Sequence, residues 1–574
     1  MNKTIFAILF SLLILAPERL LADNSSDPQA AAQDLYSQAE SFKKESTKLP
    51  EPKPKEKPEI NAEQQKEDTI DESKGPKFVL KQINLEGNTL FSREDLDQYI
   101  ILYLNKEQTL GKMKSLARLI THHYQSYGFG TSRAYVPPQS IENSIVTIKI
   151  VEGKVGKISV EGNKYYSKEI YEKALDLKSG AILNFKDLEQ GLDNINQSSN
   201  RKAKAYLAAG VEPLTSDIVL KTEENNPLYI YYTFNNHGTK LTHRARNGVG
   251  VNHTNITGHD DTLNAAFSLA EEDAFRGESL AYSFPIQKTG TTLSLATSYS
   301  DTRLVKHFKP LDITGESLAV MPEISQNFIK KTDFQLNGIL GFEYMDSKTS
   351  ISQTKLNVDR LRILKLGPQM IFSDPGGQTS LNGQFHLGIP DFLGGSKDHD
   401  VRSSVANAGG DFTYYTADIS RIQRFVATSY LTFKAGGQWT SETLPSSERF
   451  RGGGAYSVRG YPESDALGDY GYNFSAELNA PVYFLPKDWQ VPFSNKKWVD
   501  SVRMVGFLDG ASTYLRERVL PTDEKNKFLL GTGVGIRIDL GRNFSLQADL
   551  GFPVGDDSSD KNNKQFHIEI RSSF

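Results

Sequence analysis

The sequence predicts a membrane β-barrel of about 16 antiparallel strands, preceded by two small α/β units. Three observations support this prediction. Apolar and polar residues alternate from about residue 225 to the C-terminus, an internal repeat precedes this region, and the N-terminus carries a short apolar segment. The chain has 574 residues, which is enough for several domains.

The N-terminus has the features of a secretory signal peptide. Lys3 precedes an apolar run from Ile5 to Ala16, which is shorter than the about 20 residues that a membrane-spanning helix needs. We therefore expect residues 1–22 to be removed and the mature chain to leave the cytoplasm.

The next residues are polar and predict a short helix followed by a linker. Asp27 and Pro28 form a favourable helix start, and apolar residues follow at helical spacing within residues 23–45. Residues 46–76 are rich in proline and alternating charge, which favours an extended, solvated chain.

A sequence repeat marks the two α/β units. The segment INLEGNTLFSREDL from Ile83 recurs as ISVEGNKYYSKEIY from Ile158, 75 positions later. In each copy an alternating strand ends at Gly-Asn, a turn dipeptide, and a helix follows that begins at a serine. The pattern predicts a strand, two helices and two strands in each copy, at residues 77–152 and 153–224.

The region 225–574 has the alternation of barrel strands. In the terminal segment QFHIEIRSSF, Phe566 and Ile568 lie on one face, while His567 and Glu569 lie on the other. The polar faces of the two preceding segments, VGIRIDL and FSLQADLGF, contain Arg537, Asp539, Ser545, Gln547 and Asp549. A soluble sandwich also alternates. About 350 residues of strands near the membrane-crossing length of about 9–11 residues favour a barrel.

Composition and motifs exclude several classes of function. The chain has no cysteine, which excludes thiol catalysis and cysteine-ligated metals, and its net charge of −4 gives no basic field for nucleic acid. GKVGK lacks the spacing of a phosphate-binding loop, and neither HExxH nor GxSxG occurs. We expect no enzymatic activity, no cofactor and no metal site.

Several segments together resemble the two-partner secretion transporters, the outer-membrane exporters of haemolysins and filamentous adhesins. In the barrel region these are GGGAYSVRGYPE, LGDYGYNFSAELNAPV and VGFLDGAS. Before it, SYGFGTSRAYVPPQSIENSIVTIKIVEG and LNFKDLEQGLDNIN resemble the family's first and second polypeptide-transport-associated (POTRA) domains. The signature residues that this implies for the first POTRA domain are Arg133, Pro137, Pro138 and Gln139.

The resemblance implies that a loop at about 445–470 folds back into the barrel lumen and docks on the wall. The implied loop motif is Val458, Arg459, Gly460 and Tyr461, the implied wall motif is Phe507, Asp509 and Gly510, and the implied hinge is Gly452, Gly453 and Gly454. Alternation independently places Phe507 and Asp509 on the face opposite Met504 and Leu508. Because a charge facing lipid is costly, we expect Asp509 to face the lumen.

The resemblance also implies further partners. The helix within 23–45 would plug the pore, and the terminal Phe574 would be read by the barrel-assembly machinery. The client would be a large secreted protein of the haemolysin or adhesin type, and the barrel would contact outer-membrane lipid. Two alternatives remain at this stage: a factor that assembles other outer-membrane proteins, and a simple diffusion porin.

Overall fold

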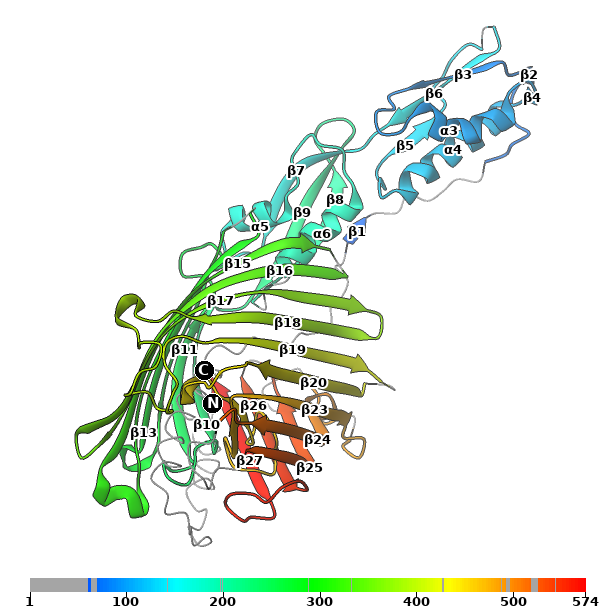
Figure 1. The fold of residues 1–574 in the computed structure, drawn as a ribbon. Coiled ribbons are helices and arrows are strands. Elements are labelled where there is room, and N and C mark those ends of the chain that lie inside the picture. Colours follow the sequence, from blue (N-terminus) through cyan, green and yellow to red (C-terminus); the bar gives the residue numbers. More distant parts are fainter. Residues whose placement is uncertain are drawn as a thin grey trace.

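The computed structural model describes residues 60–62 and 70–574, apart from short gaps. The gaps are at residues 142, 197, 199, 287–288, 332, 426–427, 487, 492–495, 518–524 and 542. Two small α/β units extend in a row from one end of a large barrel (Figure 1). The predicted signal peptide and N-terminal helix lie outside the described residues, as does most of the predicted linker.

The first α/β unit has a sheet in the order β3-β6-β5 covered by two helices. Its elements are β2 (Phe78–Val79), β3 (Gln82–Glu86), α3 (Arg93–Ile100), η1 (Ile101–Tyr103), β4 (Glu107–Gln108), α4 (Leu110–Ser126), β5 (Arg133–Tyr135) and β6 (Ile145–Val151). A capping box between Ser92 and Asp95 starts α3. Leu96 of α3 and Met113 of α4 are fully buried with Ile148 of β6, so the apolar helix faces form the core.

The second unit repeats this plan and adds one strand. Its elements are β7 (Lys154–Glu161), α5 (Lys168–Leu175), α6 (Phe185–Asn196), β8 (Arg201–Ala209) and β9 (Thr215–Glu224), and its sheet order is β1-β8-β9-β7. The added strand, β1 (Ile60–Ala62), comes from the predicted linker and runs parallel to β8, with Ile60 aligned to Ala205. The linker is therefore not solvated along its whole length, because β8 offers it the open backbone groups of a sheet edge.

A buried glutamate closes the first unit. Glu152 accepts hydrogen bonds from the backbone N–H groups of Thr89 (2.7 Å) and Leu90 (3.1 Å), and from the hydroxyl of Tyr124 (3.0 Å). Burial by itself would raise the pKa of Glu152, but these hydrogen bonds outweigh it and lower the pKa below its ordinary value. The carboxylate thus ties the turn after β3 to α4.

The second unit has a similar arrangement, although its tyrosine comes from the first helix of the unit rather than the second. Glu224 accepts hydrogen bonds from the backbone N–H groups of Lys164 and Tyr165, both at 2.6 Å, and from the hydroxyl of Tyr171 at 2.5 Å. These two N–H groups lie 75 positions after those that bind Glu152, which is the offset of the sequence repeat. The duplication therefore extends to the contact between a glutamate and the turn after the first strand, although Glu224 is less buried than Glu152.

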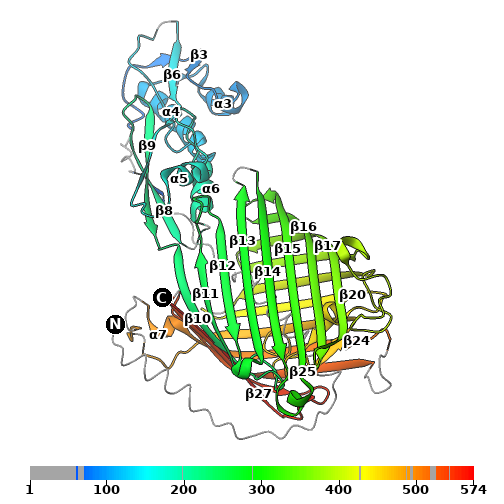
Figure 2. The same cartoon turned by 90° about the vertical axis from the view of Figure 1, so that its left-hand side faces the viewer.

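The barrel is closed and consists of 16 strands, which confirms the predicted fold class. The strands are β10 (Leu228–Asn235), β11 (Arg246–His253), β12 (Thr262–Leu269), β13 (Phe275–Ile286), β14 (Thr291–Arg303), β15 (Ile313–Lys330), β16 (Phe334–Ile351), β17 (Thr354–Asp374), β18 (Gly377–Gly388), β19 (Thr413–Arg424), β20 (Tyr430–Trp439), β23 (Tyr470–Pro481), β24 (Val502–Tyr514), β25 (Asn526–Asp539), β26 (Phe544–Pro553) and β27 (Gln565–Ser573). Each strand pairs antiparallel with the next, and β27 pairs with β10 (Figure 2).

The predicted alternation separates an apolar outer surface from a polar lumen. On β24, Met504 and Leu508 are 50% and 43% exposed, whereas Phe507 and Asp509 are buried inside the barrel. The short helices between strands are η2 (Glu271–Asp273), η3 (Lys306–Leu311), η4 (Phe392–Gly394), η5 (Ser446–Glu448) and α7 (Trp498–Ser501). Among the described residues, no helix is both long and apolar enough to cross a membrane.

The barrel has two distinguishable ends. We call the end at Leu228, where the chain enters from the second α/β unit, the proximal end, and the opposite end the distal end (Figure 2). Arg201 at the start of β8 binds Asp260, in the proximal turn between β11 and β12, through two hydrogen bonds of 2.5 and 2.8 Å. Because the Arg201 side chain is only 3% exposed, this bidentate pair fixes the second unit to the barrel.

Candidate functional site

A long connection between β20 and β23 turns into the lumen from the distal end. We call residues 440–469 the inward loop; it contains the small hairpin of β21 (Phe450–Gly452) and β22 (Ala466–Gly468). Val458 and Tyr461 of this loop are fully buried in one apolar cluster with Leu529 of β25. The loop therefore packs against the inner wall of the barrel.

The three consecutive glycines of the loop differ in conformation. Gly453 and Gly454 have φ angles of +101° and +97°, in the left-handed region that glycine adopts most easily. Gly452 instead ends β21, and a Cβ atom there would lie 3.1 Å from the Cβ of Ala511. The segment predicted as a hinge thus contains two left-handed residues and one that is glycine because it is closely packed.

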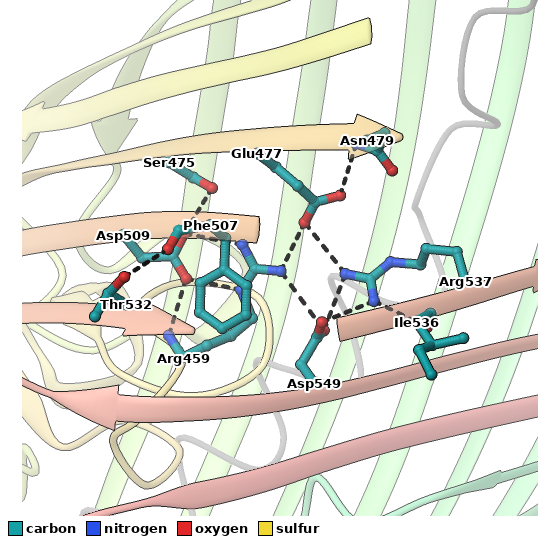
Figure 3. Close-up of polar contacts among 10 residues, drawn as sticks. All are labelled: Arg459, Ser475, Glu477, Asn479, Phe507, Asp509, Thr532, Ile536, Arg537 and Asp549. Carbon is teal, nitrogen blue, oxygen red and sulfur yellow. Dashed lines mark hydrogen bonds and ion pairs between the residues drawn. The ribbon is translucent and has the colours of Figure 1, made fainter. Parts of the chain in front are cut away.

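Arg459 at the tip of the loop meets Asp509 on the wall (Figure 3). Its Nε lies 2.7 Å from Asp509 Oδ2, its Nη2 lies 3.0 Å from Oδ1, and its backbone N–H donates to Oδ2 at 3.1 Å. The Asp509 side chain is fully buried and that of Arg459 is 7% exposed. This is the bidentate geometry in which arginine binds a carboxylate most specifically.

Two more carboxylates and a second arginine extend this pair into a network. Nη1 of Arg459 lies 2.6 Å from Glu477 Oε2 and 3.5 Å from Asp549 Oδ2. Arg537 on β25 binds both of these carboxylates, Asp549 at 2.7 and 3.0 Å and Glu477 at 3.2 Å (Figure 3). We call these five side chains the lumenal lock. It contains three carboxylates and only two guanidinium groups, so removal of Arg459 would leave one cation for three anions.

Neighbouring side chains orient the lock. The guanidinium carbon of Arg459 lies 3.6 Å from the centre of the Phe507 ring, so the cation rests on an aromatic face. The hydroxyl of Ser475 on β23 donates to Asp509 Oδ1 at 2.7 Å. Thr532 on β25 donates to the backbone oxygen of Phe507 at 3.0 Å. These contacts hold Asp509 and Phe507 in place from the strands on both sides of β24.

The other two residues of the loop motif seat the tip on β25 and β26. Gly460 has a φ angle of +111°, and a Cβ atom there would lie 2.8 Å from the backbone carbon of Phe552. The hydroxyl of Tyr461 donates to the backbone oxygen of Asp556 at 3.0 Å and accepts from the N–H of Gly555 at 3.1 Å. Only glycine allows the close approach at the tip, and the tyrosine anchors it beyond β26.

Glycines on the wall form the surface that receives the loop. A Cβ atom on Gly531 would lie 2.0 Å from the Arg459 backbone oxygen, and one on Gly551 would lie 2.5 Å from the backbone nitrogen of Gly460. Gly510 of the predicted wall motif has another neighbour, because a Cβ atom there would lie 2.4 Å from the Phe474 ring. Gly531 and Gly551, which belong to none of the sequence motifs, therefore lie in direct contact with the loop.

A second buried ion pair holds the base of the loop. Asp469, at the C-terminal end of the loop, accepts hydrogen bonds from Arg449 Nε (3.2 Å), the backbone N–H of Leu444 (2.9 Å) and the backbone N–H of Arg516 (2.7 Å). The Arg449 and Asp469 side chains are 2% and 0% exposed. The two ends of the loop are thereby joined to each other and to the connection after β24.

The remaining predicted residues lie outside the lumen. Arg133 is exposed on β5. Gln139 pairs with β6 through its side-chain amide, which accepts from Thr147 N–H (2.8 Å) and donates to Thr147 O (2.7 Å). Pro137 and Pro138 directly precede Gln139. Phe574 donates its backbone N–H to Ile230 on β10 at 2.8 Å, and 61% of the residue is exposed.

Sequence reasoning did not find Glu477, Arg537 and Asp549 as members of the site. Arg537 and Asp549 lie on the predicted polar faces of their strands, so the alternation already indicated that they face inward. Nothing in the sequence indicated that the three meet Arg459. In the closed wall β23 and β25 lie on either side of β24, and β26 follows β25, so the barrel brings the three residues close to Arg459.

The chemistry of the lumenal lock is that of a reversible ionic contact between a loop and a wall. Breaking a buried pair by removing one partner costs about 3–5 kcal/mol, and less where water can replace the lost partner. In the part of the chain that the structure describes, no cluster of three histidine, aspartate or glutamate side chains could hold a metal ion.

Two family models match this chain. The model described as haemolysin secretion/activation protein ShlB/FhaC/HecB matches residues 215–494, and the model of the ShlB-type POTRA domain matches residues 78–153. The first match includes Arg459 and Glu477, and the second covers most of the first α/β unit.

Individual proteins are similar over most of the chain. The outer membrane transporter CdiB of Dickeya dadantii is 25% identical over 493 residues, which are 84% of this chain and 83% of that protein. The heme/hemopexin transporter protein HuxB of Haemophilus influenzae is 23% identical over 530 residues, which are 88% and 89% of the two chains. The solved structure of CdiB from Escherichia coli shares the fold, with a TM-score of 0.67, 19% identity, and coverage of 97% of this chain and 100% of that chain.

Proposed function

The chain belongs to the ShlB/FhaC/HecB family of two-partner secretion transporters, and on this premise we propose that release of the lumenal lock opens its pore. The barrel lies in the bacterial outer membrane, and the two α/β units are POTRA domains in the periplasm. The protein exports a partner protein to the cell surface. The proximal end of the barrel therefore faces the periplasm and the distal end faces the outside.

The observation that carries this proposal is the docking of Arg459 on Asp509 inside the lumen. The bond joins a loop to the wall that surrounds it, so it holds the loop across the path of a client. Client contacts and water can replace the arginine as the loop moves, because the lumen is polar. Asp469 and Arg449 stay paired at the base, and the left-handed Gly453 and Gly454 take up the motion.

The client in this proposal is a large secreted protein of the haemolysin, adhesin or toxin type, and it arrives unfolded. Its extended segments add to edge strands of the POTRA sheets, such as β3 of the first unit and β7 of the second. Backbone pairing of this kind gives affinity with little demand on sequence. The chain contributes no catalysis. Folding of the client outside the cell supplies the direction of transport.

The direction of transport can be tested with the client alone. A client variant that cannot fold outside should be exported much more slowly than the wild-type client, as measured by the rate at which protease-accessible client appears on the cell surface. Export of both at the same rate would contradict this part of the proposal.

In this proposal the helix within residues 23–45 plugs the pore. Phe574 is recognised by the barrel-assembly machinery, and the outer wall of the barrel contacts lipid. Deletion of residues 24–45 should raise the ion conductance of the pore in planar bilayers. Unchanged conductance would remove the plug from the proposal without affecting the lumenal lock.

Deletion of the POTRA domains tests the export function as a whole. A variant that lacks residues 77–224 should lose client secretion, although its barrel still reaches the outer membrane. The amount of barrel in outer-membrane fractions serves as the control. A diffusion porin would need neither domain, so normal function of this variant would overturn the proposal.

A further inference from the structure

The wall of the barrel closes through its shortest strand pairing. β10 and β27 share five aligned residue pairs, from Tyr231 with Ser573 to Asn235 with Glu569. Among the neighbouring strands of the barrel, the next shortest pairing is that of β11 and β12, with seven aligned pairs. We call the β10–β27 pairing the seam. A short pairing between the first and last strands is the place where the wall would open most easily.

At the distal end of the seam, the side chain of Asn236 continues the pairing with β27 beyond the last residue of β10. β10 ends at Asn235, and the next residue, Asn236, continues the pairing with its side-chain amide. Asn236 Oδ1 accepts from the backbone N–H of Ile568 (2.9 Å), and Nδ2 donates to the backbone oxygen of Phe566 (2.7 Å). The backbone N–H of Asn236 also donates to Ile568 O at 3.2 Å. Backbone groups of β27 that β10 no longer reaches are thus satisfied by one asparagine.

Farther out, charged side chains cross the same boundary. Arg244, in the connection between β10 and β11, donates to Gln565 Oε1 (2.9 Å) and to Asp560 Oδ2 (3.0 Å). Gln565 at the start of β27 also donates to Asp560, at 2.7 Å, and Lys240 lies 3.7 Å from the same carboxylate. The Asp560 side chain is only 6% exposed, so this cluster is shielded from water.

The inward loop contributes one further contact at the seam. The hydroxyl of Tyr456 donates to Glu569 on β27 at 2.9 Å, and its ring lies 5.1 Å from that of His237, just after β10. Movement of the loop would break this contact. Asn236, Arg244 and Asp560 contact one another's elements without a partner from the loop, although the loop's Asp465 accepts a hydrogen bond from the backbone N–H of the neighbouring Ser559 at 3.1 Å.

We propose that Asn236, together with the Arg244–Asp560 pair, locks the seam, so that the barrel wall stays closed while the inward loop moves. The seam contacts do not depend on the export function. Only the consequence, that the client passes through the lumen and not through the wall, rests on that proposed function. An opened seam would expose unpaired backbone groups of β10 and β27 to lipid, which is strongly unfavourable. The alternative is a seam that opens sideways, as an assembly factor would need.

A reducible cross-link tests the path of the client. Phe234 and Ile570 are aligned across the seam, and their Phe234→Cys and Ile570→Cys replacements are suited to a disulfide, because aligned antiparallel residues have Cα atoms about 4.5–5.5 Å apart. The chain has no cysteine of its own, so no other thiol competes. Both single-cysteine variants serve as controls.

The cross-linked transporter should secrete its client at the same rate with and without reductant. Loss of secretion that reductant restores would overturn the proposal, because it would mean that the seam must open. Failure of the wild-type protein to secrete any client would instead contradict the proposed export function.

The strength of the contacts at the seam is measured without a client. Asn236→Ala and Asp560→Asn should each lower, by several degrees, the temperature at which the folded barrel in detergent changes to the unfolded form on a gel. Lys355→Ala, at an exposed position at the distal end of β17, should leave this temperature unchanged. If the Asn236→Ala and Asp560→Asn variants both unfold at the wild-type temperature, these contacts do not hold the seam.

Discussion

Asp509 in the barrel wall and Glu152 in the first POTRA domain are both buried carboxylates that accept four hydrogen bonds, but their donors differ. Three of the four donors to Asp509 belong to Arg459, 50 residues away on the inward loop. Glu152 accepts from backbone N–H groups and hydroxyls of its own domain, donated by Thr89, Leu90 and Tyr124. One carboxylate therefore holds a segment that can leave, and the other holds a segment that is part of the fold.

Because the donors differ, we expect the two carboxylates to have different roles, one in transport and one in stability. If Arg459 withdraws, Asp509 keeps only its bond to Ser475 and must be rehydrated, which the polar lumen permits. The donors to Glu152 cannot withdraw unless the turn after β3 unfolds. We therefore expect changes at the first site to alter transport and changes at the second to alter the stability of one domain.

The largest expected effect is the loss of secretion when the lumenal lock is broken. Arg459→Ala and Asp509→Ala should each remove most client secretion while the barrel still inserts, because the loop is no longer held in its position. Secretion is measured as client in the culture medium, normalised to the amount of transporter in the outer membrane. Arg503→Ala, on the same strand face as Asp509 but bound elsewhere, is the matched control and should secrete nearly normally. Normal secretion by either lock variant would end the central role of this pair.

A smaller effect is expected at the shared carboxylate of the lock. Glu477→Gln removes one charge partner of Arg459 and leaves the bidentate bond to Asp509 intact. Secretion should therefore fall between the wild-type level and that of Asp509→Ala, in the same assay. A loss as complete as that of Asp509→Ala would mean that the network acts as one unit rather than through the central pair.

On the stability side, Glu152→Gln should destabilise the first POTRA domain by about 1–3 kcal/mol, because buried donors lose a charged acceptor. Hydrogen–deuterium exchange of the full-length protein should show faster exchange in residues 77–152 and no change in the barrel strands. Glu224→Gln should have a smaller effect on residues 153–224, because Glu224 is only half-buried. Exchange that is unchanged in both domains would contradict the structural role of these glutamates.

The smallest expected effect is on pH dependence. The pKa of Glu152 lies below its ordinary value of 4.5, so its stabilising contribution is complete above that pH and is lost as the pH falls through the lowered pKa. Protection of residues 77–152 in the wild-type protein should therefore decrease from about pH 4.5 downward, after correction for intrinsic exchange rates. Glu152→Gln should lack this decrease. The same pH profile in both proteins would show that another group titrates.

Much of this architecture could be predicted from the sequence, because local patterns of residues determine it. Alternation with a period of two assigned each barrel residue to the lumen or to the outer surface, and this was sufficient to point Asp509 inward. The repeat predicted two similar domains, and the motif around Arg459, through its resemblance to a known family, indicated the residue that would meet Asp509.

Other features depended on the tertiary structure. Alternation assigns a face but not a depth or a neighbour, so it could not show that Glu477, Arg537 and Asp549 share one site with Arg459. The closed wall brings these strands together in register, and a short strand of the linker pairs with β8 only because the folded sheet presents an open edge. The sequence by itself determined which side chains are polar and inward; the closure of the barrel decided which of them meet.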